Sequence, residues 1–149
     1  MVMPLPLEKM KAAHELLVEY EYEMRPVVHG YANRTLHINL ETKEIGEKPV
    51  TQQMKDLFTG GRGFGLKLLW DAVTPETKWD DPENALVIAN GPICGTTAYA
   101  GSGKATVVTL SPLTLNVVDS NVGGYFAPFL KFAGFDAMEI SGKASEDVI

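Results

Sequence analysis

Glycines are concentrated in three short segments, at residues 60–65, 91–104 and 121–125. These segments hold most of the 14 glycines of the chain, and they contain Arg62 and Lys104. Glycine lets the backbone adopt positive φ angles and approach a ligand closely, and such turns beside a cation can bind an anionic cofactor. Tight turns between strands use the same residue type, so composition alone leaves both interpretations open.

Two common phosphate-binding motifs do not fit these segments. A mononucleotide-binding loop needs glycine five residues before its Gly-Lys pair and Ser or Thr after it, whereas this chain has Ala98 and Ala105 around residues 103–104. The glycines of residues 61–65 are spaced GxGxG rather than GxGxxG, and no strand is predicted immediately before them. Neither a nucleoside triphosphate nor a dinucleotide is therefore the predicted ligand.

Composition limits the remaining classes of function. The net charge of -6 and the lack of clustered Lys and Arg argue against nucleic-acid binding. The single cysteine, Cys94, excludes an internal disulfide and a four-cysteine cluster built from this chain alone. No secretory signal or membrane segment is evident, so a cytoplasmic location is the expectation. His14, His29 and His37 lack metal-ligand spacing, and no catalytic residue is predicted.

Hydrophobic periodicity predicts several strands and short helices in one α+β domain. Apolar residues recur at helical spacing between residues 7 and 24, and this pattern allows either core packing or a docking helix. Thr51 is expected to cap a helix that breaks at residues 60–61, after which a second helix runs to about Val73. The predicted strands cover 35–40, a short segment near 45, 85–89, 105–110, 116–119 and 137–141, and a further helix covers 126–132.

The order of seven motifs resembles that of the tungsten-dependent aldehyde ferredoxin oxidoreductase family. The resemblance spans about residues 30–144 and leaves the first 29 residues outside it. The motifs are Gly30-Tyr31 before Leu36–Leu40, GGRGFG at 60–65, Pro82-Glu83-Asn84, Gly91–Thr96, Ser111–Thr114, Ser120–Phe126 and Leu130–Asp136. We therefore expect a helical extension at 1–29 and the family's N-terminal, pterin-cradling domain at 30–149, incomplete at its C-terminus. The resemblance implies that this domain is a β-rich base with short flanking helices.

The resemblance implies a tungsten (or molybdenum) bis-pterin cofactor whose phosphates are bridged by magnesium. It assigns the backbone carbonyl of Asn121 to the magnesium, a hard cation that prefers oxygen ligands. The implied cofactor-binding residues are Arg62, Gly63, Gly101, Gly103, Lys104, Asn121, Gly123 and Gly124. The chain departs from the family where relatives carry Gly-Gly-Arg, because it reads Gly-Ser-Gly-Lys at residues 101–104. Lysine neutralises a phosphate as a point charge but lacks the planar fork of arginine.

The implied activity is oxidation of aldehydes to carboxylic acids with ferredoxin as the electron acceptor. The [4Fe–4S] cluster of the family requires four cysteines and is expected only in the complete protein, so this chain alone is predicted to be inactive. The expected partners are the remaining domains or a subunit of the enzyme, ferredoxin and a second copy in a homo-oligomer. Two alternatives stay open, namely a benzoyl-coenzyme A reductase type of chemistry and a cofactor-free assembly or interaction module.

Overall fold

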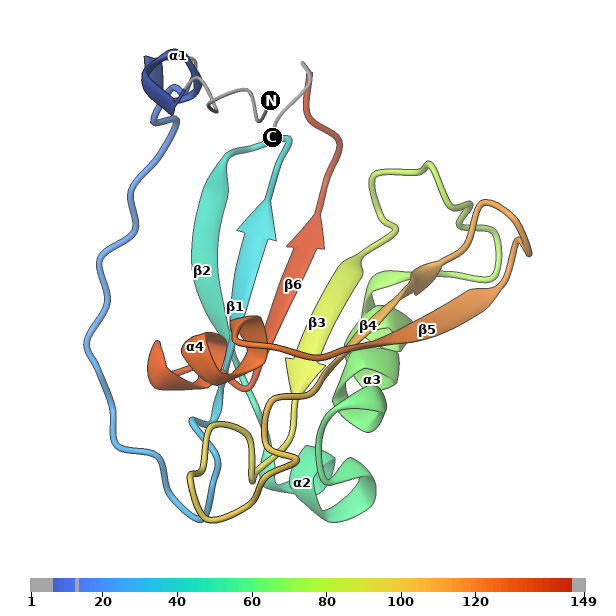
Figure 1. The fold of residues 1–149 in the computed structure, drawn as a ribbon. Helices are drawn as coiled ribbons and strands as arrows, with labels where there is room; N and C mark the ends of the chain where they lie inside the picture. Colours follow the sequence, from blue (N-terminus) through green and yellow to red (C-terminus); the bar gives the residue numbers. More distant parts are fainter. Residues whose placement is uncertain (1–6, 13, 146–149) are drawn as a thin grey trace, which may run out of the picture.

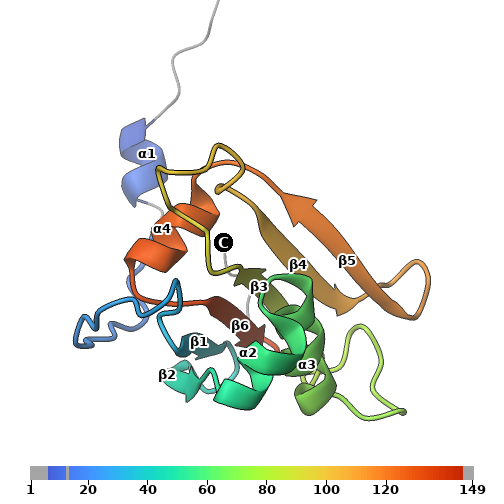
Figure 2. The ribbon, with the colours of Figure 1, turned by 90° about the horizontal axis from the view of Figure 1, so that it is seen from below.

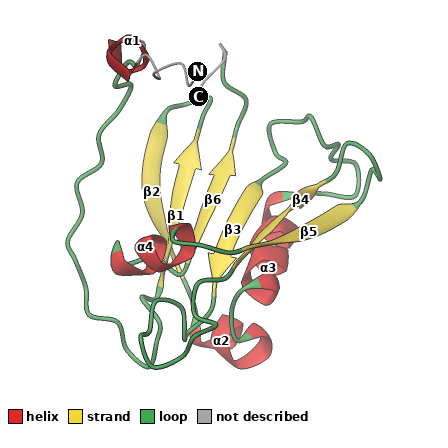
Figure 3. Cartoon of the chain, viewed as in Figure 1, coloured by secondary structure: helices red, strands yellow, loops and turns green. Residues whose placement is uncertain are grey.

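A single six-stranded mixed sheet forms the centre of the molecule (Figures 1 and 3). The computed structural model describes residues 7–12 and 14–145. The strands are β1 (Arg34–Asn39), β2 (Glu44–Pro49), β3 (Leu86–Asn90), β4 (Ala105–Leu110), β5 (Val117–Val122) and β6 (Ala137–Ser141), in the order β2-β1-β6-β3-β4-β5. Only the β1–β6 pair is parallel, and the other neighbouring strands run antiparallel. The α+β class predicted from the sequence is confirmed.

One face of the sheet, here called the closed face, is covered by two helices, α2 (Gln52–Phe58) and α3 (Arg62–Ala72) (Figure 2). Phe64 and Leu69 of α3 are almost fully buried against the sheet. They share one core cluster with Val87 of β3 and Val108 of β4. Because side chains alternate between the two faces of a strand, this cluster defines which residues of every strand face the helices.

Local sequence explains how α2 and α3 begin and approach the sheet. The backbone N–H of Met54 donates to Oγ1 of Thr51 at 3.2 Å, which is the predicted N-cap. Gly65 allows α3 to pack closely on β4, since a Cβ atom at this position would lie 2.5 Å from Cγ2 of Val108. The glycine at 65 is therefore explained by helix–sheet packing.

The opposite face, here called the open face, is covered at one end only. The short helix α4 (Phe126–Phe132) lies there, in front of the sheet in Figure 1. Ala127 of α4 packs with Cys94, Ala105 and the partly buried Ile88. The predicted helix at 126–132 is thus confirmed. Unlike a typical amphipathic helix, it exposes aromatic side chains on the side that points away from the sheet.

The prediction of one helix through residues 7–24 is wrong. Helix α1 spans Leu7–Ala12, Ala13 lies outside the described residues, and residues 14–24 form no helix. The chain instead runs alongside β2 in Figure 1, and Tyr22 reaches the sheet with its ring 5.1 Å from that of Phe135. A short helix without tertiary contacts is only marginally stable in water. In this segment the aromatic contact of Tyr22 therefore replaces the predicted helix.

The other predicted strands and the helix after residue 60 are confirmed within one or two residues at most ends. β5 is longer than predicted and continues to Val122. No helix in the described part of the chain has the length and apolar character needed to cross a membrane.

Candidate functional site

The candidate site lies at the edge of the sheet formed by β5, the last strand in the described order. Ser111 N donates to the carbonyl of Asn116 at 2.9 Å, which makes these two residues a hydrogen-bonded pair. Hydrogen-bonded and non-hydrogen-bonded pairs alternate along an antiparallel ladder. Asn121, opposite Thr106, therefore belongs to a non-hydrogen-bonded pair. Its backbone N–H and C=O point away from β4, toward the edge of the sheet.

An independent contact supports this phase of the ladder, that is, this assignment of hydrogen-bonded and non-hydrogen-bonded pairs between β4 and β5. Val117 has the same phase as Asn121, and its backbone N–H donates to the side-chain oxygen of Asn116 at 2.8 Å rather than to β4. Asp119 lies between them with the same outward orientation of its main chain. The outer edge of β5 thus presents a row of backbone carbonyl oxygens that are available to a ligand.

Five of the residues predicted for the site gather where β4 begins and β5 ends. A Cβ atom on Gly103 would lie 2.9 Å from the carbonyl oxygen of Gly124. A Cβ atom on Gly123 would lie 3.5 Å from Nζ of Lys104, whose residue is exposed. On the next ladder position inward, Thr106 Oγ1 lies 3.4 Å from Oδ1 of Asn121. The glycines therefore allow the cationic side chain of Lys104 to lie close to a backbone segment that has no side chains of its own.

Arg62 lies near this group but its charge is already paired. Its Nε and Nη2 atoms each lie 2.8 Å from Oδ2 of Asp119, so the ion pair joins the first turn of α3 to β5. Both side chains are partly solvent-exposed, and an ion pair of this kind contributes little to overall stability. The sequence did not predict this ion pair, because the two residues lie 57 positions apart.

The two other predicted residues lie apart from this group. Gly63 faces α2, because a Cβ atom there would lie 2.6 Å from Cβ of Phe58. Gly101 belongs to the long connection before β4, beside the ring of Tyr99. Two of the glycine-rich segments are only partly turns, since residues 62–65 begin α3 and residues 121–122 end β5.

Two buried polar groups that sequence reasoning did not single out connect the helices to the segments around the sheet. The side-chain amide of Asn90 donates to the carbonyls of Ala127 at 3.4 Å and Phe135 at 3.3 Å, while its backbone carbonyl accepts from Gly61 N at 2.9 Å. Its Oδ1 atom is buried without a partner among the described residues. Asn90 therefore connects α3, α4 and the segment before β6.

Lys131 and Asp136 form the second group. Lys131 Nζ contacts Oδ1 of Asp136, and both side chains are almost fully buried. The carboxylate also accepts from the backbone N–H groups of Ala32 and Asn33, at 3.0 and 2.7 Å. Because each buried charge is paired and hydrogen-bonded, this cluster fixes the start of β1 against the start of β6.

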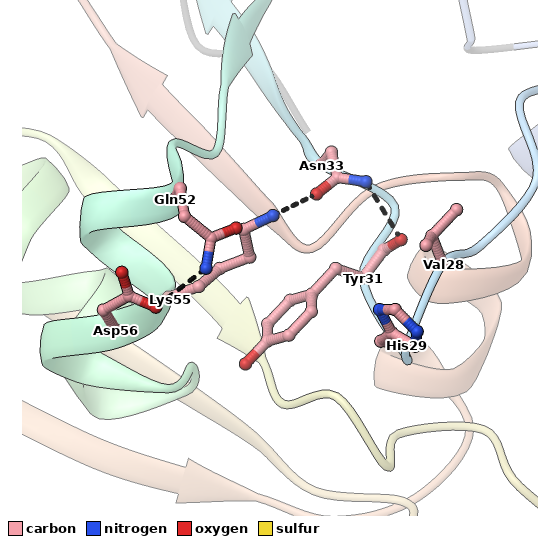
Figure 4. Close-up of a pocket in the computed structure, with 7 residues that line it drawn as sticks. All are labelled: Val28, His29, Tyr31, Asn33, Gln52, Lys55 and Asp56. Atoms are coloured by element: carbon pink, nitrogen blue, oxygen red, sulfur yellow. Dashed lines mark hydrogen bonds between the residues drawn. The ribbon is translucent and has the colours of Figure 1, made fainter.

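A surface pocket of about 410 Å³ lies elsewhere, between the start of β1 and α2 (Figure 4). Several of its polar side chains bond to one another or to the backbone. Lys55 Nζ donates to Oδ1 of Asn33 at 2.8 Å, Gln52 donates to Asp56 at 2.7 Å, and the hydroxyl of Tyr31 donates to the Thr59 carbonyl at 2.7 Å. None of the predicted site residues lines this pocket. Burial, followed by the charges of Asp136 and Asp56, raises the pKa of Tyr31, so the phenol stays protonated near neutrality.

The described residues offer no side-chain cluster suited to a metal ion. No group of three or more His, Cys, Asp or Glu side chains gathers in residues 7–12 and 14–145 in an arrangement that could hold one. Cys94 is buried, and burial raises the pKa of its thiol, with the charge of Lys131 opposing this effect. The thiolate that a metal would need is therefore disfavoured. A metal at this site would take backbone oxygens.

The chain was compared with protein families and curated proteins. The family model described as aldehyde ferredoxin oxidoreductase, N-terminal domain, matches residues 35–149. The tungsten-containing aldehyde ferredoxin oxidoreductase of Pyrococcus abyssi is 41% identical over 119 residues, which cover 80% of this chain and 19% of that protein. The protein of the same description from Pyrococcus furiosus is 40% identical over 121 residues, which cover 81% and 20%.

The similar proteins also include enzymes that are described as acting on compounds other than aldehydes. The aliphatic sulfonate oxidoreductase, WOR-like subunit, of Pyrococcus furiosus is 32% identical over 124 residues. A solved structure described as the active site complex BamBC of benzoyl coenzyme A reductase with 1,5-dienoyl-CoA matches with a TM-score of 0.75 and 36% identity. That match covers 78% of this chain and 18% of the solved chain.

The matched segment is thus a small part of each relative. The chain spans about a fifth of the length of the curated relatives it matches. The family match nevertheless includes β1 from its second residue, the strands β2 to β6 and every residue predicted for the site. On this evidence the chain belongs to the aldehyde ferredoxin oxidoreductase family and carries its N-terminal domain.

Proposed function

We propose that this chain is the cofactor-cradling base of a larger tungsten (or molybdenum) bis-pterin oxidoreductase. The proposed reaction of the whole enzyme is oxidation of an aldehyde to a carboxylic acid, with ferredoxin as the electron acceptor. When bound, the metal held by two dithiolene pterins supplies the redox chemistry. The family membership and the curated relatives support this proposal.

One observation carries the role of the chain, namely the outward carbonyl of Asn121 on the edge of β5. A magnesium ion between pterin phosphates would need oxygen ligands, and the bare edge of β5 offers them at Asn121. Lys104 would neutralise a phosphate, while Gly103, Gly123 and Gly124 would let it approach the backbone. The residues present therefore fit the chemistry of the phosphate end of the cofactor.

We assign Arg62 an indirect role in this arrangement. Its guanidinium pairs with Asp119, which is two residues from Asn121 on β5. Arg62 would then hold the strand that presents the carbonyl rather than bind a phosphate itself. Gly63 and Gly101 would act through packing and loop shape, since both lie away from Lys104 and Asn121.

Replacement of Lys104 by alanine tests the proposed phosphate contact in the complete enzyme. A hydrogen bond to a charged group contributes about 1.5–3 kcal/mol, so the affinity for the cofactor should fall roughly tenfold to hundredfold. The measurement is the pterin and metal retained per chain after extensive dialysis. Lys104→Arg should retain the cofactor, and Lys143→Ala, at another exposed lysine, serves as the matched control. Unchanged retention in Lys104→Ala would remove Lys104 from the site.

The similarity to the benzoyl coenzyme A reductase complex supports a second candidate function. In that case the same base would hold the cofactor of an enzyme that acts on an aromatic coenzyme A thioester. Substrate assays on the complete enzyme with an aldehyde and with benzoyl-coenzyme A separate the two candidates. The [4Fe–4S] cluster, in either case, would come from other parts of the enzyme, because this chain has one cysteine.

A further inference from the structure

The turn that joins α2 to α3 contains a strained residue. Thr59 has φ 60° and ψ −48°, and the backbone N–H of Gly60 donates to the carbonyl of Phe58 at 2.6 Å. A hydrogen bond that encloses one residue with such angles is a γ-turn with positive φ, which is rare and strained. Threonine is branched at Cβ, so it is especially disfavoured in this conformation. The Thr59 side chain is exposed, and its own packing therefore does not select the strained turn.

Hydrogen bonds from other parts of the fold hold this turn. The hydroxyl of Tyr31 donates to the carbonyl of Thr59 at 2.7 Å, across 28 positions of sequence, and this bond is here called the clasp. On the other side of the turn, Gly61 N donates to the carbonyl of Asn90, at the end of β3, at 2.9 Å. Strained backbone persists where the surrounding structure fixes it, and it is concentrated at functional sites.

Tyr31 is itself fixed in a way that suits a clasp. Its ring centroid lies 6.2 Å from that of Phe64, and Nζ of Lys55 lies 5.4 Å from the Tyr31 centroid. Figure 4 shows the phenol extending from the segment before β1 toward α2. Because burial, followed by the charge of Asp136, raises the pKa of Tyr31, the hydroxyl keeps its proton and can donate.

The strained turn leads directly into a residue that we link to the cofactor edge. Arg62 follows Gly61 at the first position of α3 and pairs with Asp119 of β5, at 2.8 Å. Asp119 is two residues from Asn121, whose backbone carbonyl points toward the edge of the sheet. A displacement of the turn would therefore reach the Asn121 carbonyl through a single ion pair.

We propose that Tyr31 is a positioning residue for the cofactor edge, because its hydroxyl stabilises the strained turn at Thr59 and thereby sets where Arg62 holds β5. The inference rests on the proposed function, in which a cofactor binds at that edge. The family model begins its match at residue 35, so the match assigns no role to Tyr31. The ring of Tyr31 packs on Phe64, and the hydroxyl is the part that acts on the turn.

Hydrogen exchange and cofactor retention in the complete enzyme test this role together. Tyr31→Phe keeps the ring against Phe64 and removes only the hydroxyl. The backbone amides of Gly61, Gly63 and Gly65 are hydrogen-bonded in and just after the turn. They should exchange about threefold to tenfold faster, the range expected for loss of one neutral hydrogen bond. The rate at which pterin is lost during dialysis should rise by a similar factor.

Two further variants separate the clasp from ordinary packing. Thr59→Gly removes the Cβ atom that makes positive φ unfavourable. Adding Tyr31→Phe to Thr59→Gly should therefore change the exchange rates by about twofold or less, because the two residues are coupled. An equal effect of Tyr31→Phe in both backgrounds would contradict coupling through backbone strain. Tyr20→Phe, at a ring that stacks on Tyr22 away from the turn, is the matched control and should change neither readout.

The two readouts distinguish failure of this role from failure of the proposed function. Unchanged exchange in Tyr31→Phe would overturn the clasp, and faster exchange without faster pterin loss would overturn the positioning role. Equally faster exchange in β3 and β4 would show that the hydroxyl acts on global stability instead, which also contradicts the inference. An unsubstituted enzyme that contains no tungsten, molybdenum or pterin would contradict the proposed function, while the exchange rates would still show whether the clasp exists.

Discussion

The closed and open faces of the sheet are built from the same strands but have opposite environments. Val87 and Val108 on the closed face are fully buried beneath α3, whereas Leu86 on the open face is 38% exposed. Around β3 and β4 both faces are apolar, so the sequences of these two strands are nearly continuous runs of hydrophobic residues. An apolar surface that the described residues leave partly exposed is typical of an interface.

The largest expected difference between the two faces concerns a pair of phenylalanines. Phe64→Ala removes a fully buried ring from the closed face and should lower the free energy of unfolding of the 149-residue chain by about 3–5 kcal/mol. Phe129→Ala removes a ring that is mostly exposed and should change it by about 0.5 kcal/mol or less. Urea denaturation measures both values. Equal losses would show that the two faces do not differ in this way.

A smaller effect is expected at a glycine on the closed face. Gly65→Ala would place Cβ 2.5 Å from Cγ2 of Val108, and overpacking of this kind costs about 1–3 kcal/mol. The gain in helix propensity from glycine to alanine is only about 1 kcal/mol and offsets part of that loss. Gly46→Ala is the matched control, because no atom lies within 4 Å of its added Cβ. A Gly65→Ala chain as stable as the control would mean that α3 packs less tightly on β4 than described.

Much of the fold was predictable from local pattern. The alternation in residues 35–40 and the apolar runs at 85–89 and 105–110 predicted strands, and Thr51 predicted a helix start, all of which are confirmed. The predicted helix through residue 24 is not confirmed. Periodicity identifies an apolar stripe, but it does not show whether the folded protein offers a surface on which that stripe could pack. Tyr22 instead packs on Phe135, more than a hundred residues later in the chain.

The arrangement of the candidate site was less predictable. Motif order predicted the site residues Asn121, Lys104, Gly123 and Gly124. Whether the carbonyl of Asn121 points outward, however, depends on the alternation of hydrogen-bonded and non-hydrogen-bonded pairs in the β4–β5 ladder. That phase is set by the turn between the strands, and no single residue reports it. The pairing of Arg62 with Asp119 likewise depends on how α3 crosses the sheet, which the sequence does not specify.

The metal content of the complete enzyme tests the central claim most directly. If this domain is the base of a bis-pterin site, elemental analysis of the purified enzyme should find about one tungsten or molybdenum atom per chain, together with pterin. A homogeneous, folded enzyme that contains neither metal and no pterin would contradict the claim and would favour an assembly module that keeps the fold without the cofactor.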